Sequence, residues 1–378
     1  MTNMRFKVAI LQHRLLHYRV DLFERLRADL IARGIQLEVV YGQASHEESK
    51  RGDEGRLDWG HQVKNHIFSL GGKDLIWQPL PPELADSDLL VLMQENRILS
   101  NYPHLFKWSS YKGKLAYWGH GRNFQSINPT GLRERWKRGL VTSVDWWFTY
   151  TETSATYLYE CGFPAHKLTC LNNAVDTRKF ASQITTANNT AAELRQELGI
   201  SKEDYVGIYC GSLYPGKRLD FLTDVAKSIQ ARLGRFHLLI VGNGPEYERL
   251  QAQALDNPNI HLLGVRKGVK KARLYGISDV VLNPGAVGLH ILDAFAAGLP
   301  MITTKGAMHG PEIAYLEDGK NGLVCNDLLE SYVDAVIDLL EDRAMYNKIS
   351  NNARQDAERY TLDKMVAHFS EGIEQCLA

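Results

Sequence analysis

Short apolar runs of strand length alternate with amphipathic helical segments along most of the chain. In the first half the expected strands are residues 6–11, 36–42, 88–94, 114–121, 145–150 and 167–173. In the second half they are residues 205–211, 236–244, 259–265, 279–285, 300–306 and 322–327. Continuous apolar strands separated by helices are typical of a parallel sheet covered by helices on both faces. The pattern therefore predicts an α/β fold built from doubly wound sheets.

The alternation pauses once, where residues 184–200 are rich in Thr, Asn and Ala and show no strand signal. We interpret this stretch as a linker between two Rossmann-like domains, residues 1–183 and residues 201–360, facing each other across a cleft. Apolar residues at helical spacing in residues 361–378 predict a closing C-terminal helix.

Composition and charge narrow the class of protein. The chain has 378 residues, 44% of them hydrophobic, and its 44 Lys and Arg residues balance 44 Asp and Glu residues. These values exclude a disordered tail, a collagen-like repeat and a strongly basic protein that binds nucleic acid. The net charge of zero hides a difference between the two halves of the chain. Residues 1–183 carry 24 cationic and 19 anionic side chains, whereas residues 184–378 carry 20 cationic and 25 anionic ones.

The cysteines and the N-terminus bear on the compartment. Five cysteines lie far apart and include no CxxC pair, so we expect reduced thiols rather than disulfides or a zinc ribbon. Arg14, His17 and Arg19 fall where a signal peptide needs its hydrophobic core, and no run reaches the roughly 18 apolar residues of a membrane span. We therefore expect a cytoplasmic protein.

Open parallel sheets bind ligands beyond the carboxyl ends of their strands, where loops and helix N-termini converge. Most loops in those places carry glycine or a basic residue, which suits an anionic ligand. The residues of the N-terminal half that we expect to face the cleft are His17, Arg19, Glu95, Arg97, Arg122 and Asn173. For His17 and Arg19, a plain surface position fits the sequence equally well.

One stretch after a predicted strand, GSLYPGKRLDFL (211–222), opens a helix with two positive charges. Gly211 and Gly216 allow the backbone to approach a ligand closely, and Lys217 and Arg218 lie at the helix start. The arrangement suits a phosphate or diphosphate. A solvated basic turn explains it equally well, because the spacing is not that of a P-loop.

A second stretch, PGAVGLHILDAFAAGLPMITT (284–304), places Gly285 and Gly288 where a helix begins and Asp293 early in that helix. Backbone N–H groups at this point would hold phosphates, while the carboxylate of Asp293 accepts hydrogen bonds from a ribose diol. The alternative, a buried helix with an unpaired Asp, is less favourable because burying an unpaired carboxylate is costly.

Three further features carry candidate chemistry. His120 lies between glycines at the end of a predicted strand, which favours a cleft position over a structural one. The DSD sequence (86–88) resembles a metal-binding pair but precedes its strand, so we interpret it as a cap and expect no bound metal. The basic segment Arg133 to Arg138, close to Trp146 and Trp147, is either a solvated helix face or a contact to an anionic membrane surface.

Together these motifs resemble those of retaining glycosyltransferases of family 4, which have the two-domain GT-B fold. The resemblance is strongest over residues 150–321. GSLYPGKRLDFL is similar to the family's phosphate-binding turn, IVGNGPEYERL (240–250) to its next glycine turn, and GVRKGVKKARLYGISDVVLNPG (264–285) to its base-side loop. Residues 151–180 are similar to the end of the family's first domain, and HGPEIAYLEDGKNGLV (309–324) to its PE…G.NG segment.

The chain departs from the family pattern at two places. The family's paired acidic motif has two Glu residues; here Asp293 stands for the second, and Gly285 occupies the place of the first, eight positions before it. The Arg often found after the glycine of the phosphate turn is Ser212. We expect Arg218, beside Lys217, to replace that charge.

The resemblance implies metal-independent transfer of a sugar from a UDP- or GDP-linked donor to an acceptor hydroxyl, with the anomeric configuration retained. It implies that Lys217 and Arg218 stabilise the leaving diphosphate, and that His120 lies over the sugar. The donor-side residues it implies are Gly211, Ser212, Gly242, Gly244, Val265, Arg266, Gly285, Gly288, Leu289, His290 and Asp293.

The expected acceptor is a glycan or lipid-linked glycan of a bacterial surface, with a peripheral contact to the inner face of the cell membrane and no nucleic-acid partner. Two alternatives stay open. An epimerase acting on a nucleotide sugar would use Glu95 and Glu312 as acid and base, and a non-catalytic protein would bind a sugar nucleotide without turnover.

Overall fold

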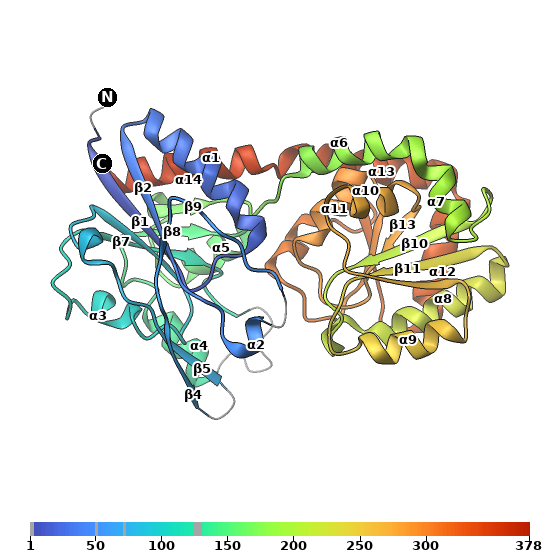
Figure 1. The fold of residues 1–378 in the computed structure, drawn as a ribbon, viewed down its shortest axis with the longest axis horizontal. Coiled ribbons are helices and arrows are strands. Elements are labelled where there is room, and N and C mark those ends of the chain that lie inside the picture. The colour runs from blue at the N-terminus through green and yellow to red at the C-terminus, as the bar shows by residue number, and fades with distance from the viewer. Residues whose placement is uncertain (1–3, 50–51, 71–72, 124–130) are drawn as a thin grey trace. The chain divides into compact units, whose positions relative to one another are not determined.

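The computed structural model describes residues 4–49, 52–70, 73–123 and 131–378. The chain forms two compact units (Figure 1). Unit 1 contains Met1–Val175 and Leu362–Ala378, and unit 2 contains Asp176–Thr361. The chain therefore leaves unit 1 for unit 2 and returns to it for its last helix.

Unit 1 is built on a seven-stranded parallel sheet of order β3-β2-β1-β6-β7-β8-β9. Its strands are β1 (Phe6–Gln12), β2 (Ile35–Tyr41), β3 (His61–Gln62), β6 (Leu89–Met93), β7 (Lys114–Gly119), β8 (Trp146–Thr149) and β9 (Leu168–Cys170). All six strands predicted for the first half are present. An antiparallel hairpin of β4 (His66–Leu70) and β5 (Lys73–Trp77) was not predicted.

Helices pack on this sheet and complete its core. They are α1 (Val20–Ala32), α2 (His46–Ser49), α3 (Asn101–Leu105), α4 (Leu132–Gly139), α5 (Glu152–Glu160) and α14 (Leu362–Leu377). The predicted C-terminal helix is thus confirmed, and it packs beside α1 (Figure 1). The ring of Phe369 on α14 lies 5.0 Å from that of Trp118 and 4.5 Å from that of Phe148, so the last helix supplies part of the core of unit 1.

Unit 2 has a six-stranded parallel sheet of order β12-β11-β10-β13-β14-β15. Its strands are β10 (Tyr205–Cys210), β11 (Phe236–Val241), β12 (Ile260–Gly264), β13 (Val280–Leu282), β14 (Met301–Thr304) and β15 (Gly322–Cys325). Its helices are α6 (Thr177–Ala187), α7 (Ala191–Glu197), α8 (Leu219–Leu233), α9 (Tyr247–Leu255), α10 (Gly268–Gly276), α11 (His290–Ala297), α12 (Leu329–Glu341) and α13 (Arg343–Arg359). The doubly wound α/β prediction is confirmed for both units.

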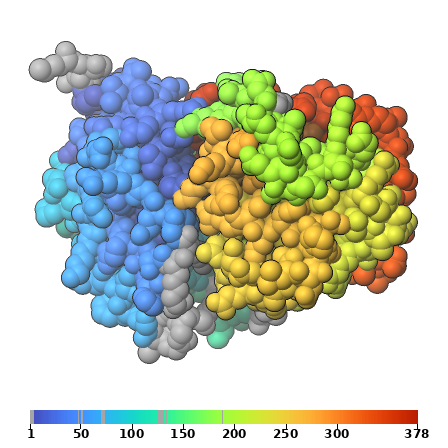
Figure 2. All heavy atoms as spheres, turned by 45° about the vertical axis from the view of Figure 1, so that its right-hand side comes forward, coloured from blue at the N-terminus to red at the C-terminus, as the bar shows by residue number. Residues whose placement is uncertain are grey.

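The predicted linker at residues 184–200 is wrong, because most of this stretch is helical and belongs to unit 2. The boundary between the units lies at residues 175 and 176 rather than at 183 and 184. Helices α6 and α7 pack on α10, and Figure 2 shows the green atoms of this region against the orange ones. The buried face of α6 and α7 has few apolar side chains. Phe180, Ala187 and Leu194 are buried, but they recur only every seventh residue among Thr, Asn and Ala, so the apolar periodicity of the sequence is weak.

No helix in the part of the chain that the structure describes is long and apolar enough to span a lipid bilayer.

Candidate functional site

The phosphate turn of unit 2 follows β10 and is joined to the loop before α11. Lys217 ends a short 3-10 helix (Pro215–Lys217) and is buried. Its Nζ donates a hydrogen bond to the carbonyl of Ala286, whose own N–H donates to the carbonyl of Gly216 at 3.1 Å. Burial lowers the pKa of Lys217 to about 8, and the negative charge of Glu312 opposes this shift. The two glycine stretches singled out from the sequence therefore form one site.

Glycine at position 285 is required by this close approach. A Cβ atom at Gly285 would overlap the backbone of Lys217, so no side chain fits there while the turn keeps its place. Gly242, with a φ of 149°, has the same role at the next loop, because a Cβ there would overlap the carbonyl oxygen of Gly211. At Gly288, in contrast, a Cβ would meet no atom within 4 Å. The departure from an acidic residue at position 285 thus has a steric cause.

The N-terminus of α11 lies directly after this loop. His290 is its first residue, and the Nε2 of His290 is buried without a hydrogen-bond partner among the described residues. Burial, together with the charges of Lys217 and Lys271, holds the pKa of His290 well below its ordinary value, so its ring is neutral. Asp293 forms an ion pair with Lys271, with 2.9 Å between Oδ1 and Nζ. Asp293 is therefore not the unpaired carboxylate of the alternative interpretation.

Arg218 is bonded to neighbouring side chains of unit 2. Its φ of 55° lies in the left-handed region, and its Nη1 donates to the Oγ1 of Thr304 at 2.8 Å. The same guanidinium forms an ion pair with Asp327. Burial alone would raise the pKa of Asp327, but hydrogen bonds from Arg218 and Thr304 together with the charge of Arg218 outweigh it and lower that pKa. The positive charge of Arg218 is thus matched within unit 2.

The remaining predicted donor residues lie on the same edge of the sheet of unit 2. The carbonyl of Ser212 accepts a hydrogen bond from the hydroxyl of Tyr209 at 2.9 Å. Val265 is 53% exposed, and its carbonyl accepts a hydrogen bond from Arg266 at 3.1 Å. Val265 and Arg266 follow the edge strand β12. Leu289 directly precedes α11, and Gly244 lies in the loop after β11.

In unit 1, one group of predicted residues gathers after β7 and β8. The ring of His120 lies 4.1 Å from that of Tyr150, and the guanidinium of Arg19 lies 4.2 Å from the ring centroid of Trp118 and 5.3 Å from that of Tyr150. Burial, with smaller contributions from Lys137 and Arg19, lowers the pKa of His120 to about 3. His120 is therefore neutral across the physiological pH range, and its Nδ1 is buried without a partner among the described residues.

Three other residues of the predicted set lie in different surroundings. Asn173 is buried, and its backbone N–H donates to the carbonyl of Tyr150 at 2.8 Å. Asn173 therefore lies beside the group of His120, Tyr150 and Arg19. The guanidinium of Arg122 lies 5.1 Å from the ring centroid of Tyr157. His17 is exposed, and its Nδ1 lies 3.1 Å from the carbonyl oxygen of Asp53.

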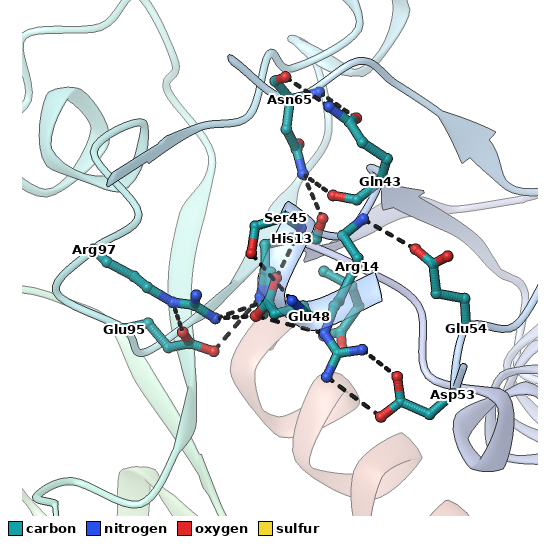
Figure 3. A network of polar contacts seen from close by, with 12 residues as sticks. His13, Arg14, Gln43, Ser45, Glu48, Asp53, Glu54, Asn65, Glu95 and Arg97 are labelled. Carbon is teal, nitrogen blue, oxygen red and sulfur yellow. Dashed lines mark hydrogen bonds and ion pairs between the residues drawn. The ribbon is translucent and has the colours of Figure 1, made fainter. Parts of the chain in front are cut away.

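A second group in unit 1 is a charge network centred on Glu48 (Figure 3). The Oε1 of Glu48 accepts a hydrogen bond from Nη2 of Arg97 at 2.8 Å and lies 3.3 Å from Nε2 of His13. Arg97 also donates from its Nε to Glu95 at 2.6 Å. On the other side Arg14 lies 3.6 Å from Glu48. The structure thus brings together the predicted pair Glu95 and Arg97 with His13, Arg14 and Glu48.

Both charged partners at the centre of the network are stabilised in their ionised forms. Burial would raise the pKa of Glu48, but hydrogen bonds from His13, Arg97 and the N–H of Ser45 lower it far below its ordinary value. Burial would lower the pKa of Arg97, but Glu95 and Glu48 raise it. Glu48 and Arg97 therefore keep their charges at any pH near neutrality.

A sequence signal for Glu48 exists, although it is local. Ser45 and Glu48 form a capping box, in which the N–H of Ser45 donates to Glu48 at 3.1 Å and the N–H of Glu48 donates to the Ser45 hydroxyl at 3.4 Å. The S-x-x-E pattern predicts the start of α2 but not the long-range partners of Glu48. His13 and Arg14 come directly after β1, where the rule for parallel sheets places ligand-binding residues.

The DSD sequence and the basic segment lie elsewhere in unit 1. Asp88 precedes β6, and its side chain accepts a hydrogen bond from the N–H of Lys7 at 2.7 Å, which confirms the interpretation as a cap. Trp146 and Trp147, close to the basic segment in sequence, are buried in the predicted strand β8 and so lie away from any surface contact.

Other aromatic side chains do accompany the basic helix α4. Phe106, Trp108, Leu132 and Trp136 form an exposed aromatic patch, with the ring of Phe106 lying 4.9 Å from that of Trp108 and 6.3 Å from that of Trp136. The cations next to the patch are Lys107, Arg135 and Arg138, all exposed, while the side chain of Arg133 lies outside the described part.

Comparison with known proteins places these features in a class. The whole chain resembles the structure of Anabaena Alr3699/HepE in complex with UDP-glucose, with a TM-score of 0.69, 17% identity, and coverage of 98% of this chain and 100% of that one. Together with the two parallel-sheet units, this likeness defines a GT-B fold. Residues 190–356 match the family described as glycosyl transferases group 1.

Two curated relatives each match about half of the chain. A GDP-mannose-dependent alpha-(1-6)-phosphatidylinositol monomannoside mannosyltransferase of Mycobacterium tuberculosis is 31% identical over 194 residues, which cover 48% of each chain. The sulfoquinovosyl transferase SQD2 of Arabidopsis thaliana is 26% identical over 201 residues, 52% of this chain and 38% of that protein. The chain therefore spans about half or less of the length of these relatives.

Proposed function

We propose that the protein is a retaining glycosyltransferase that moves a sugar from a nucleoside-diphosphate donor, UDP- or GDP-linked, to an acceptor hydroxyl. The observation that carries this proposal is the buried Lys217, whose ammonium lies at the loop before α11 in the segment that matches glycosyl transferases group 1. A cation and a helix N-terminus at one point suit a diphosphate leaving group.

The proposed role of Lys217 is to stabilise the charge that develops on the leaving diphosphate. Backbone N–H groups of Gly288, Leu289 and His290 would assist it from the start of α11. Arg218 contributes less, because its charge is matched by Asp327. Asp293, held by Lys271, would accept hydrogen bonds from the ribose hydroxyls.

His120 has an orienting role in this proposal. A histidine with a pKa of about 3 stays neutral during turnover, so it accepts or donates hydrogen bonds but is a poor general base. We propose that it orients the sugar or the acceptor from unit 1. We also propose that no metal takes part, since the charge on the leaving group is met by Lys217 and helix dipoles, and the DSD sequence is a cap at the opposite ends of the strands.

The proposed acceptor is a glycan, free or lipid-linked, as in bacterial surface polysaccharide or glycolipid synthesis. The relative from Mycobacterium tuberculosis acts, by its name, on a phosphatidylinositol monomannoside. The aromatic patch with its three exposed cations is the proposed site of peripheral contact with an anionic membrane surface.

A panel of nucleotides followed by a transfer assay tests the function. Of UDP, GDP, ADP, TDP and CMP, we expect UDP or GDP to raise the unfolding temperature, because a ligand at ~100 times its dissociation constant stabilises by about 2.7 kcal/mol. Incubation with the matching nucleotide sugars and glycan acceptors should then give a new glycosidic bond. Altered donor without acceptor would indicate an epimerase, and binding without turnover would indicate a non-catalytic protein.

Asp293→Ala tests the ribose assignment. Loss of a hydrogen bond to a charged group should weaken nucleotide binding by about tenfold in calorimetry. Asp224→Ala, which removes an exposed carboxylate from α8, is the matched control and should leave the affinity unchanged. An unchanged affinity of Asp293→Ala would remove this residue from the site.

A further inference from the structure

The charge network of unit 1 has an inner part and an outer edge. The side chains of His13, Arg14 and Glu48 are only 10%, 6% and 10% exposed, whereas those of Glu95 and Arg97 are 31% and 32% exposed. Glu95 and Arg97 follow β6, and His13 and Arg14 follow β1, its neighbour in the sheet. The outer pair therefore lies at the edge of the sheet where parallel α/β units bind ligands.

The inner part fixes the position of the outer pair. Arg97 is held from two sides, because its Nε bonds to Glu95 at 2.6 Å and its Nη2 to Glu48 at 2.8 Å. Glu95 is also 3.5 Å from Nδ1 of His13. Figure 3 shows these groups converging on one point. Because Glu48 and His13 are buried and bonded to the outer pair, the edge is held in place before any ligand arrives.

Each guanidinium of the network is paired with a carboxylate. Three carboxylates, those of Glu48, Asp53 and Glu95, face two guanidinium groups and one imidazole. An anionic ligand at this edge would approach Arg97 only together with the carboxylates of Glu95 and Glu48. Local charge therefore disfavours phosphates and uronates here, although residues 1–183 as a whole carry more cations than anions.

Hydroxyl groups fit this edge better than charged groups do. A carboxylate only accepts hydrogen bonds and a guanidinium only donates them, whereas each sugar hydroxyl both donates and accepts. Two neighbouring hydroxyls can thus bond to Glu95 and Arg97 without adding charge. A small cavity beside Glu95, with room for about one water molecule, is lined by Gln94, Asn96 and Lys137 as well as by apolar side chains such as Leu105 and Leu140.

We propose that the edge formed by Glu95 and Arg97, positioned by Glu48, binds an uncharged saccharide through its hydroxyl groups. The proposal rests on the proposed function and names the chemical class of its acceptor: a neutral sugar unit rather than a phosphorylated or uronic one.

Saturation-transfer NMR on the full chain tests the proposal, with the methyl glycosides of glucose, galactose and mannose as neutral probes and those of glucuronic and galacturonic acid as anionic ones. We expect at least one neutral glycoside to give saturation transfer and the uronates at equal concentration to give much less. Glu95→Gln and Arg97→Gln should each weaken the neutral signal by about tenfold.

A matched control is available on α1. Asp29 bonds to Nε of Arg33 at 2.8 Å with an exposure similar to that of Glu95 and Arg97, so Asp29→Asn removes a comparable pair elsewhere in unit 1 and should leave the signal intact. Arg97→Lys is the second variant if Arg97→Gln fails to fold, and it should also lose the signal because lysine lacks the forked donor.

Three results would overturn the proposal: uronates that bind as well as the neutral glycosides, a neutral signal that survives both edge variants, or no signal from any neutral glycoside. Nucleotide thermal shifts on the same samples separate this failure from that of the proposed function. If UDP or GDP binds and transfer depends on Lys217, the function stands while the acceptor class is wrong. If no nucleotide binds, the function fails whatever the saccharide result.

Discussion

The two units share one architecture but treat charge in opposite ways. In unit 1 the network around Glu48 matches each guanidinium with a carboxylate, and Arg14 and Arg97 lie 2.5 Å and 2.8 Å from Asp53 and Glu48. In unit 2 the ammonium of Lys217 donates to a backbone carbonyl, and its pKa is lowered to about 8. The difference shows that a parallel sheet edge does not by itself determine which ligand it suits.

The charge network of unit 1 and the buried Lys217 of unit 2 differ in their free-energy cost when no ligand is bound. The network of unit 1 is satisfied as it is, so a ligand there gains only by adding hydrogen bonds. Lys217 is buried, and its Nζ bonds to a backbone carbonyl, so a bound diphosphate would relieve part of its desolvation. The first arrangement favours a neutral partner, and the second favours an anion.

The largest expected effect comes from breaking the network of unit 1. Glu48→Gln removes a buried charge that three cationic or polar partners share, and should lower the free energy of unfolding by about 3 kcal/mol. All seven tryptophans lie in unit 1, so tryptophan fluorescence in urea reports its unfolding. Glu317→Gln, which breaks the exposed pair with Lys320, is the control and should cost well under about 1 kcal/mol. Equal costs for the two variants would show that the network is no more than a surface pair.

Removing the positive charge of Lys217 should lower turnover rather than impair folding. Lys217→Ala is expected to reduce the turnover number of transfer by about 100-fold or more, because one donor to the leaving group is lost. Steady-state kinetics with the donor identified by thermal shift measures the effect. Lys227→Ala, on the exposed face of α8, should retain normal turnover. Near-normal activity of Lys217→Ala would exclude the residue from the mechanism.

The pH dependence of nucleotide binding sharpens the contrast. The proposed role requires a protonated Lys217, so the affinity for the nucleotide should be constant below pH 8 and fall by up to about tenfold per pH unit above it. Calorimetry from pH 7 to pH 9.5 measures the profile. Lys217→Arg keeps its charge in this range and should show no such fall. A wild-type profile as flat as that of the arginine variant would contradict the assignment.

The smallest expected effect concerns membrane binding by the aromatic patch and the exposed cations beside it. Trp108→Ala and Trp136→Ala should each weaken binding to anionic vesicles by about fivefold, since each removes an exposed ring from the aromatic patch. Trp77→Ala, which removes a ring of 42% exposure outside the patch, is the control. Co-sedimentation at low and high salt measures the binding, and equal losses for all three variants would rule out a localised contact.

Periodicity predicted every strand of the two large sheets except the two-residue polar strand β3, because their apolar runs are continuous and nearly free of interruption. It failed at α6 and α7, where Phe180, Ala187 and Leu194 are too sparse to stand out. Lys217 was predicted from its place after a strand and beside glycines. Glu48 was not, because it lies 35 residues from His13 and 49 from Arg97, and only the fold makes them neighbours.

The steric cause of Gly285 was equally hidden in the sequence. Nothing in the stretch 284–304 indicates that the backbone of Lys217 occupies the space of a side chain at position 285. Contacts between distant loops determine such positions, whereas local propensity determines the elements that carry the loops.

The return of the last helix to unit 1 has a consequence for synthesis on the ribosome. Unit 2 is one continuous stretch, Asp176–Thr361, and can complete its fold as soon as that stretch has emerged. Unit 1 begins first but finishes last, because Phe369 must cover Trp118 and Phe148. Until then this apolar face of the older unit stays open. A nascent chain stalled near its end would therefore hold a finished C-terminal unit and an unfinished N-terminal one.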